Sequence, residues 1–429
     1  MMRVTWNLLG SFLLLLAGAR NAFAAVPEAT ERFHFAEAAK YSEQMSGHAV
    51  LISIDGKIVF EEYQNGYSAD RATNIYSATK SFWGPAVAAM IADGLLSSYD
   101  ENVSETLVEW KEDAAKSRIT VRQLLDLSAG LAQDLRALKG EGSAQNMYEY
   151  ALGLRQASQP GERFQYGPAS FYVLGEFISR KLGSKYKDPL DYLTKRILDP
   201  LGIRYTEWLR DSAGNPHVPN GAHLTARDWW RFGQFLLQRG EWEGRQIVPR
   251  DLLVESIRPS RLNPGYGLTF WLNNPNGFGE RMSAPSGTPA GVIYPDGYPD
   301  IYAAMGAGTN DLFIVPSLGM VIVHQAEAEA SGTLRQSPDT VFSRAKFLSL
   351  LFTGQAGTMT EPITREFPGQ SPLPGGRTDA LFDRLDRNED GRLSADEIPD
   401  RLRKLKSNFD EMDRNHDGYL TADEMNPPQ

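Results

Sequence analysis

The 429-residue sequence contains no cysteine. This absence excludes disulfides, thiolate zinc sites and a cysteine nucleophile. Histidine is also scarce: the six His residues are scattered, without a His-Glu-x-x-His motif, so a zinc hydrolase is not expected. Positive charge is not in excess either. The net charge of -10 argues against a nucleic-acid-binding protein.

Long apolar runs are missing apart from one near the N-terminus. The largely apolar run Leu8–Ala17 follows Arg3 and precedes Ala22-Phe23-Ala24. This order is typical of a secretory signal peptide, which we predict over residues 1–24. The run is far shorter than the roughly 20 residues that a membrane span needs, which disfavours an uncleaved anchor. We therefore expect a periplasmic or secreted protein that does not span the membrane.

The composition changes after Phe352. Residues 354–376 contain four Pro and five Gly with few apolar side chains, which is typical of a linker. Residues 377–429 form an acidic tail with 14 Asp and Glu against 9 Lys and Arg, which is half of the net charge of the chain. The length allows a large core plus an appendage. We predict a main domain over residues 26–353, a linker over 354–376 and a small module over 377–429.

The main domain is expected to be mixed α/β. His48–Ile54 and Lys57–Tyr63 are rich in β-formers and flank Asp55-Gly56, which predicts a hairpin. Strands near both ends with helices between them favour one sheet closed by both termini. Further strands are predicted over 264–272, 311–316 and 319–324, and helices over 26–39, in 97–130, and within 189–203 and 225–256.

One stretch, Tyr76–Gly84, carries the candidate chemistry. It contains Ser77-x-x-Lys80, and an apolar segment follows it. If Ser77 opens a helix, the i,i+3 spacing places Lys80 over the same face. A serine hydroxyl needs a base within hydrogen-bond reach to become a nucleophile. The helix N-terminus suits a developing oxyanion. Pro85 requires a kink or an irregular first turn in this helix.

Other serines match parts of this pattern. Ser184–Lys187 lies in a polar run, and Ser343–Lys346 lies on a late amphipathic segment without a partner motif. Ser128 is followed by Gly130, but Asp126 occupies the position where a nucleophile elbow needs glycine, so Gly-x-Ser-x-Gly is absent. We interpret Ser128 as a residue at a helix end. The setting of Ser77, between a hairpin and an apolar helix, favours it as the nucleophile.

Two further motifs follow in order: Tyr166-Gly-Pro168, and Ala304-Met-Gly306-Ala-Gly308 ahead of a strand. Together with Ser77-x-x-Lys80, they resemble those of the serine β-lactamase-like hydrolases. That group includes class C β-lactamases, D-alanyl-D-alanine peptidases, esterases and 6-aminohexanoate-dimer hydrolases. The resemblance covers roughly residues 35 to 352, and other segments share it: 121–130, 224–233 and 266–271. It implies an antiparallel sheet flanked by helices, with the active site between the sheet and a helical subdomain.

The resemblance also implies roles for four residues. Ser77 would be the acylated nucleophile, and Lys80 the base or the charge that sets the base. Tyr166 would pass a proton to the leaving group. The backbone N–H groups of Ser77 and Ala307 would form the oxyanion hole. The substrate would be a small molecule.

Two departures from the family pattern narrow this expectation. The Tyr-x-Asn motif is Tyr166-Gly-Pro168 here, so the side-chain amide is missing. The Lys-Thr-Gly motif is Ala304-Met305-Gly306 here, so no cation at that position meets a β-lactam carboxylate. Both favour an esterase, or an amidase of the aminohexanoate-oligomer type, with β-lactam hydrolysis a side reaction at most. The alternative is a catalytically silent or weak β-lactamase-like or penicillin-binding protein.

The tail contains two twelve-residue loops of the EF-hand type, 27 residues apart. In each, oxygen ligands fall at positions 1, 3 and 5, glycine at 6, a backbone carbonyl at 7, Ser or Thr at 9 and Glu at 12. Two calcium sites are therefore predicted, from Asp386, Asn388, Asp390, Arg392, Ser394 and Glu397, and from Asp413, Asn415, Asp417, Tyr419, Thr421 and Glu424. A paired module of this kind also resembles dockerins, so attachment to a scaffold protein is the binding alternative.

Overall fold

The computed structural model describes residues 32–138, 144–277, 292–326 and 342–357, with residues 393, 394, 398, 406, 409–413, 418 and 420 of the tail. The chain divides into two compact units, Met1–Pro362 and Ile363–Gln429. The predicted signal peptide, residues 1–24, and most of the predicted linker, residues 358–376, lie outside the described residues. Within the described ranges, no helix is long and apolar enough to cross a membrane.

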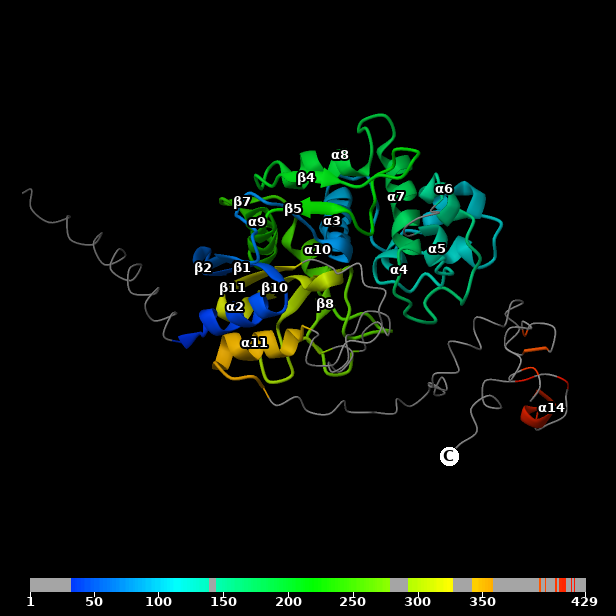
Figure 1. Ribbon diagram of the computed structural model, residues 1–429. Helices are drawn as coiled ribbons and strands as arrows, with labels where there is room; N and C mark the ends of the chain where they lie inside the picture. The colour runs from blue at the N-terminus through cyan, green and yellow to red at the C-terminus, as the bar shows by residue number, and fades with distance from the viewer. Residues whose placement is uncertain are drawn as a thin grey trace, which may run out of the picture. The chain divides into compact units, whose positions relative to one another are not determined.

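A six-stranded antiparallel sheet forms the centre of the first unit (Figure 1). Its strand order is β2-β1-β11-β10-β9-β8. The N-terminal β1 lies beside the late strand β11, with Leu51 opposite Val323. This pairing confirms the expected sheet closed by both ends of the domain. The strands are β1 (Gly47–Ile54), β2 (Lys57–Tyr63), β8 (Trp271–Leu272), β9 (Tyr302–Gly306), β10 (Asn310–Val315) and β11 (Met320–Ala326).

The first hairpin forms where the sequence predicts it. Asp55 and Gly56 connect β1 to β2, with φ values of 48° and 77°. Positive φ at both central residues is what a tight hairpin turn requires, and Asp-Gly adopts it readily. The local sequence therefore fixes both the turn and the edge of the sheet.

Helices cover both faces of the sheet (Figure 1). Along β1, Val50 and Ile52 pack with α2 and α11 on one face, while Ala49 and Leu51 face the core on the other side, which includes α9. This alternation follows the two-residue period of a strand. Burying one such side chain stabilises the fold by roughly 1.5–3 kcal/mol. The helices are α2 (Phe35–Gln44), α9 (Ala226–Leu237) and α11 (Arg344–Thr353).

A second group of helices adjoins α3 (Trp83–Ala92) and forms the helical side of the site (Figure 1). It comprises α4 (Val121–Leu125), α5 (Leu135–Leu138), α6 (Met147–Leu152), α7 (Ala169–Leu182), α8 (Pro189–Leu193) and, nearer the sheet, α10 (Arg250–Glu255). A three-stranded sheet has the order β3-β5-β4, with β3 at Thr73–Asn74, β4 at Tyr205–Trp208 and β5 at Ala222–Leu224. A small hairpin, β6 (Glu241–Trp242) and β7 (Arg245–Gln246), separates α9 from α10.

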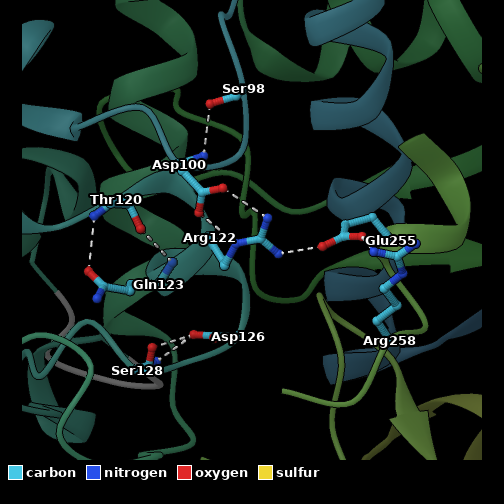
Figure 2. A network of polar contacts seen from close by, with 9 residues as sticks. All are labelled: Ser98, Asp100, Thr120, Arg122, Gln123, Asp126, Ser128, Glu255 and Arg258. Atoms are coloured by element: carbon cyan, nitrogen blue, oxygen red, sulfur yellow. Dashed lines mark hydrogen bonds and ion pairs between the residues drawn. The ribbon is translucent and has the colours of Figure 1, made fainter. Parts of the chain in front are cut away.

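The helical prediction for residues 97–130 is largely wrong. The segment contains short 3₁₀ turns and only one α-helix, α4. Its polar side chains hydrogen-bond to nearby backbone: Asp113 Oδ1 accepts from the N–H groups of Ala115 and Lys116, both at 2.9 Å. Such local bonds compete with helix formation. The segment is tied down instead by Arg122, which pairs with Asp100 and Glu255 (Figure 2).

Two other segments differ from expectation. The predicted strand over 264–272 is reduced to β8, because Gly267 N–H bonds to the Phe270 carbonyl in a turn and Thr269 has φ 82°. Within the described residues, the segment predicted as a helix over 26–39 contains α2, which runs from Phe35 to Gln44, and residues 26–31 lie outside the described ranges. The segments 189–203 and 225–256 contain helices and turns as expected.

Candidate active site and calcium module

Ser77 lies in a 3₁₀ helix, Tyr76–Phe82, that leads directly into α3. Tyr76 has φ 48°, an unusual value for a tyrosine, and its N–H donates to Asn74 Oδ1 at 2.8 Å. Pro85 is the third residue of α3, where the N–H of the first turn needs no helical partner. The proline is therefore accommodated by the irregular 3₁₀ turn before α3, the second of the two expected solutions.

Lys80 is brought against Ser77, as the i,i+3 spacing predicts. Its Nζ lies 3.0 Å from Ser77 Oγ and 3.0 Å from the carbonyl oxygen of Pro219. The lysine is 3% exposed, whereas Ser77 is half-buried. Both oxygen partners are uncharged. The Ser77 hydroxyl thus has an amine within hydrogen-bond reach, the arrangement that an activated serine needs.

The Pro219 contact was not anticipated from the sequence. Pro219 precedes β5, which pairs with β3 just before the 3₁₀ helix, and Ile75 N–H donates to the Ala222 carbonyl at 2.9 Å. The loop before β5 is thereby anchored beside Lys80. No local motif marks it, because Pro219 is 139 residues away from Lys80 in sequence.

Tyr166 also lies close to Lys80. The Lys80 ammonium is 5.0 Å from the Tyr166 ring centre. The half-buried tyrosine ring is packed by Trp271 at 5.4 Å and Tyr266 at 6.3 Å between ring centres. Trp271 belongs to β8, whose partner strand β9 leads to Gly306. Aromatic side chains therefore flank the predicted proton-transfer residue.

The end of β9 approaches the 3₁₀ helix closely at Gly306. A Cβ atom there would lie 2.1 Å from the carbonyl oxygen of Ile75 and 3.2 Å from Ala78 N. Only glycine permits this backbone contact. Ala307, the next residue, is exposed and begins a short turn in which Gly308 has φ 67°. The structure thus brings Ser77, Lys80, Tyr166 and the Ala307 turn to one place.

Polar residues of the neighbouring strands β10 and β11 hydrogen-bond to this turn. Asn310 Nδ2 donates to the carbonyl oxygens of Ala307 at 2.9 Å and Ala326 at 2.8 Å. His324 Nδ1 lies 2.6 Å from the Thr309 carbonyl oxygen. His324 is fully buried, and burial lowers its pKa to about 4. The neutral imidazole thus donates from Nδ1 to the turn.

A buried ion pair supports β10, the strand that follows this turn. Arg344 Nε lies 2.6 Å from Asp311 Oδ2, and its second nitrogen lies 3.0 Å from Oδ1. These supporting residues were missed from the sequence. The available signal was Asn310-Asp311, two polar residues opening an apolar strand that is buried throughout.

The other serine candidates have different settings. Ser343 is the N-cap of α11, and its Oγ accepts from Lys346 N–H at 3.2 Å. Ser184 and Lys187 are exposed. Ser128 follows α4, as expected, and its Oγ donates to Asp126 Oδ1 at 2.5 Å. Among the described serines with a Ser-x-x-Lys spacing, Ser77 has the direct contact between hydroxyl and ammonium.

In the second unit, the described residues pair the two predicted loops. Leu393 and Leu420, the eighth residues of the loops, exchange two backbone hydrogen bonds of 2.8 Å and are fully buried. Asp413 Oδ2, at position 1 of the second loop, accepts from Gly418 N–H at position 6 at 2.8 Å. Phe409, in the short helix α14 (Phe409–Met412), is buried.

The remaining predicted calcium ligands fall largely outside the described residues. Ser394 and Asp413 are described, whereas Asp386, Asn388, Asp390, Arg392, Glu397, Asn415, Asp417, Tyr419, Thr421 and Glu424 are not. The bond from Gly418 N–H to Asp413 Oδ2 spans the first half of the second loop, whose sequence offers oxygen donors of the kind that suits calcium. The ligand sets stay predictions.

Comparison with protein-family models gives a match to "Beta-lactamase" over residues 26–335, most of the chain. The chain belongs to the beta-lactamase family. The match lies in the first unit, which therefore has the β-lactamase-like fold. A model described as "EF hand" matches residues 378–398 and 405–426. We name the two units the hydrolase unit and the EF-hand unit.

Three relatives illustrate the similarity. The 6-aminohexanoate-dimer hydrolase of Paenarthrobacter ureafaciens is 27% identical over 236 residues, 50% of this chain and 58% of that protein. A D-stereospecific amidohydrolase from Streptomyces sp. has a TM-score of 0.54 at 15% identity, over 75% of this chain and 99% of its own. A family VIII carboxylesterase has a TM-score of 0.51 at 16% identity, over 73% and 96%. The two structures share the fold.

Proposed function

We propose that the protein is an exported serine hydrolase that cleaves esters or linear amides of small molecules through an acyl-enzyme on Ser77. The observation that carries the proposal is the contact of 3.0 Å between Lys80 Nζ and Ser77 Oγ in a buried setting. The neutral form of Lys80 would accept the hydroxyl proton while Oγ attacks the substrate carbonyl carbon.

The remaining groups complete the reaction. The backbone N–H groups of Ser77 and Ala307 would stabilise the negative oxygen of the tetrahedral intermediate. Tyr166, beside Lys80, would pass the proton to the leaving alcohol or amine as the carbonyl bond to it breaks. Water would then attack the acyl-enzyme, give its proton to the same groups, and release the acid.

An uncharged substrate fits this site best. Ala304 offers no cation for a carboxylate, and Tyr166 is flanked by Trp271 and Tyr266. The relative from Paenarthrobacter ureafaciens acts on a linear amide by its name, and a structural neighbour is a carboxylesterase. We place esters and linear amides ahead of β-lactams for this chain. The signal-peptide pattern supports export to the periplasm or beyond.

The EF-hand unit is proposed to bind two calcium ions. Asp386, Asn388, Asp390, Arg392, Ser394 and Glu397 would hold one, and Asp413, Asn415, Asp417, Tyr419, Thr421 and Glu424 the other. The backbone pairing of Leu393 with Leu420 supports two loops acting as one module. Calcium outside the cell would keep even weak sites filled, so a structural role is favoured. Attachment to a scaffold protein through this unit is the alternative role.

Purified mature protein should be assayed on short-chain p-nitrophenyl esters, nitrocefin and the aminohexanoate dimer, beside Ser77→Ala. We expect hydrolysis of esters or of the linear amide much faster than of nitrocefin, and loss of all of it in Ser77→Ala with the fold retained. Efficient nitrocefin turnover would contradict the substrate assignment. Inactivity of the wild type on all three would favour a silent penicillin-binding-type protein.

A further inference from the structure

The loop that carries Tyr166 is bonded on both sides of the tyrosine to a single segment, residues 126–133. Gln165 N–H donates to the Leu127 carbonyl at 2.8 Å. Ala169 N–H donates to Gln133 Oε1 at 3.1 Å. Gly167 lies against Gln133, because a Cβ there would be 1.9 Å from Oε1. Contacts of residues 165, 167 and 169 with the segment 126–133 thus hold Tyr166 in place.

The same segment anchors the rest of that loop. Gly161 N–H donates to the Ser128 carbonyl at 2.8 Å, and Ala157 N–H donates to the Gly130 carbonyl at 2.8 Å. These bonds and that of Gln165 use the backbone carbonyls of residues 127, 128 and 130, so the path of the loop depends on the backbone conformation of residues 127–130.

That conformation is unusual at Leu127. Its φ is 63°, in the left-handed region, which is unfavourable for a residue with a side chain. Asp126 holds it in place: Oδ1 accepts from Ser128 N–H at 3.1 Å and from Ser128 Oγ at 2.5 Å (Figure 2). The two bonds span Leu127 and close the backbone around it. Strained backbone of this kind persists where surrounding contacts enforce it, and often at functional sites.

Burying the Asp126 carboxylate at this position is energetically unfavourable. Asp126 is 9% exposed and Ser128 2%. The nearby Arg122 is engaged by Asp100 and Glu255 (Figure 2). Burial raises the pKa of Asp126 to about 6, so at neutral pH the fold carries a charge that burial disfavours. A buried carboxylate with this unfavourable charge fits a positional role for Asp126 better than a stabilising role.

We propose that Asp126 is a positioning residue for Tyr166: through Ser128 it holds Leu127 in the conformation whose carbonyl fixes Gln165 and, with it, the tyrosine. The inference rests on the proposed role of Tyr166 in protonating the leaving group. Loss of the Asp126 bonds would let the Tyr166 loop shift while Ser77 and Lys80 stay paired.

Leaving-group dependence tests this directly. p-Nitrophenolate departs without being protonated, whereas ethoxide needs a proton. With p-nitrophenyl and ethyl butyrate, which share an acyl group, Asp126→Ala should lower kcat/KM for the ethyl ester by about ten- to a hundredfold, the range that misplacement of a catalytic group causes. The p-nitrophenyl ester should lose less than about threefold, as expected for acylation that still has its base and oxyanion hole.

Three variants complete the design. Asp126→Asn keeps an acceptor oxygen and should restore most of the ethyl-ester activity, including where Asp126→Ala folds poorly. Asp113→Ala removes another aspartate that caps backbone N–H groups, outside the Tyr166 loop, and should change neither ester selectively. Tyr166→Phe should reproduce the selective loss on the ethyl ester.

The outcomes distinguish failure of the positioning role of Asp126 from failure of the proposed function. An equal loss on both esters in Asp126→Ala, or no loss, while Tyr166→Phe remains selective, would overturn the positioning role and leave the proposed function standing. Wild-type behaviour of Tyr166→Phe on the ethyl ester would contradict the proposed function itself, and the positioning role would fall with it.

Discussion

In the hydrolase unit, the Lys80 ammonium lies among protein groups: the Ser77 hydroxyl, the Pro219 carbonyl and the Tyr166 ring. In the EF-hand unit, the described acidic ligand Asp413 accepts one loop N–H, from Gly418, and the predicted set gathers several carboxylates around one point. The first unit surrounds this ammonium with uncharged partners from within the chain. With the predicted ligand set, the second would need a cation to offset repulsion between its carboxylates. We therefore expect one site to be arranged by folding and the other by its ion.

Among the substitutions that test this difference between the two sites, the largest effect is expected for Lys80. Lys80→Met removes the base from Ser77 without removing much volume, so kcat/KM on short esters should fall by about a thousandfold or more, as for loss of a member of a catalytic triad. Lys187→Met, in the exposed Ser184-x-x-Lys187 match, is the matched control and should stay close to wild type. Activity of Lys80→Met near wild type would show that the base is another group.

The EF-hand unit should respond to calcium where the hydrolase unit does not. Glu397→Gln with Glu424→Gln removes the two bidentate ligands, so titration calorimetry of the full chain should lose its calcium binding. Glu411→Gln, an acidic residue of the tail outside both loops, should retain it. Calcium binding that survives the double substitution would refute the two predicted sites.

All eight Trp residues precede residue 272, so their fluorescence reports unfolding of the hydrolase unit alone. Calcium should leave this fluorescence melting temperature unchanged in the wild type. A calcium-dependent shift would show that the ion site and the hydrolase unit are energetically coupled.

Acid should destabilise the hydrolase unit through His324. Burial lowers its pKa to about 4, so between pH 6.5 and 4 the unfolded chain binds a proton that the folded protein does not. Stability from this group is complete above pH 6.5 and is lost as pH falls toward 4, by about 3 kcal/mol or less. His324→Asn keeps a donor for the Thr309 carbonyl and should flatten the fall in melting temperature. Parallel profiles for the two proteins would contradict this assignment.

The smallest effect is expected from removing the EF-hand unit. Deletion of residues 363–429 should leave ester hydrolysis within about threefold, because a Pro- and Gly-rich linker separates the two units. A deletion that abolishes hydrolysis while the Trp-monitored fold persists would show that the tail contributes to the active site.

Strongly local patterns predicted much of the fold. The β-rich runs of β1 and β2 and the Asp55-Gly56 turn between them specify a hairpin from neighbouring residues alone. The same kind of reasoning was wrong for the polar stretch 97–130, because Asp113 satisfies backbone groups in a short turn, whereas Thr120 caps the short helix α4. Whether such side chains cap a helix or replace one depends on packing that the local sequence does not contain.

The candidate active site likewise contains some residues that the sequence pairs and others that only the fold brings together. Ser77 and Lys80 could be paired from the sequence, since the i,i+3 spacing of one helical turn brings them together. Their supports could not: Pro219 reaches Lys80 across 139 residues, and Gln133 reaches Ala169 across 36. Backbone carbonyls carry no sequence signature. The residues that hold a catalytic group therefore emerge only once the chain is folded.

Covalent labelling tests the central claim most directly. The wild-type protein should be treated with a fluorophosphonate, digested, and its peptides analysed by mass spectrometry, with the Ser77→Ala variant alongside. The account predicts a single adduct on Ser77, in step with loss of ester hydrolysis, and no adduct in Ser77→Ala. An adduct on another residue such as Ser128, or labelling and hydrolysis that persist in Ser77→Ala, would contradict it.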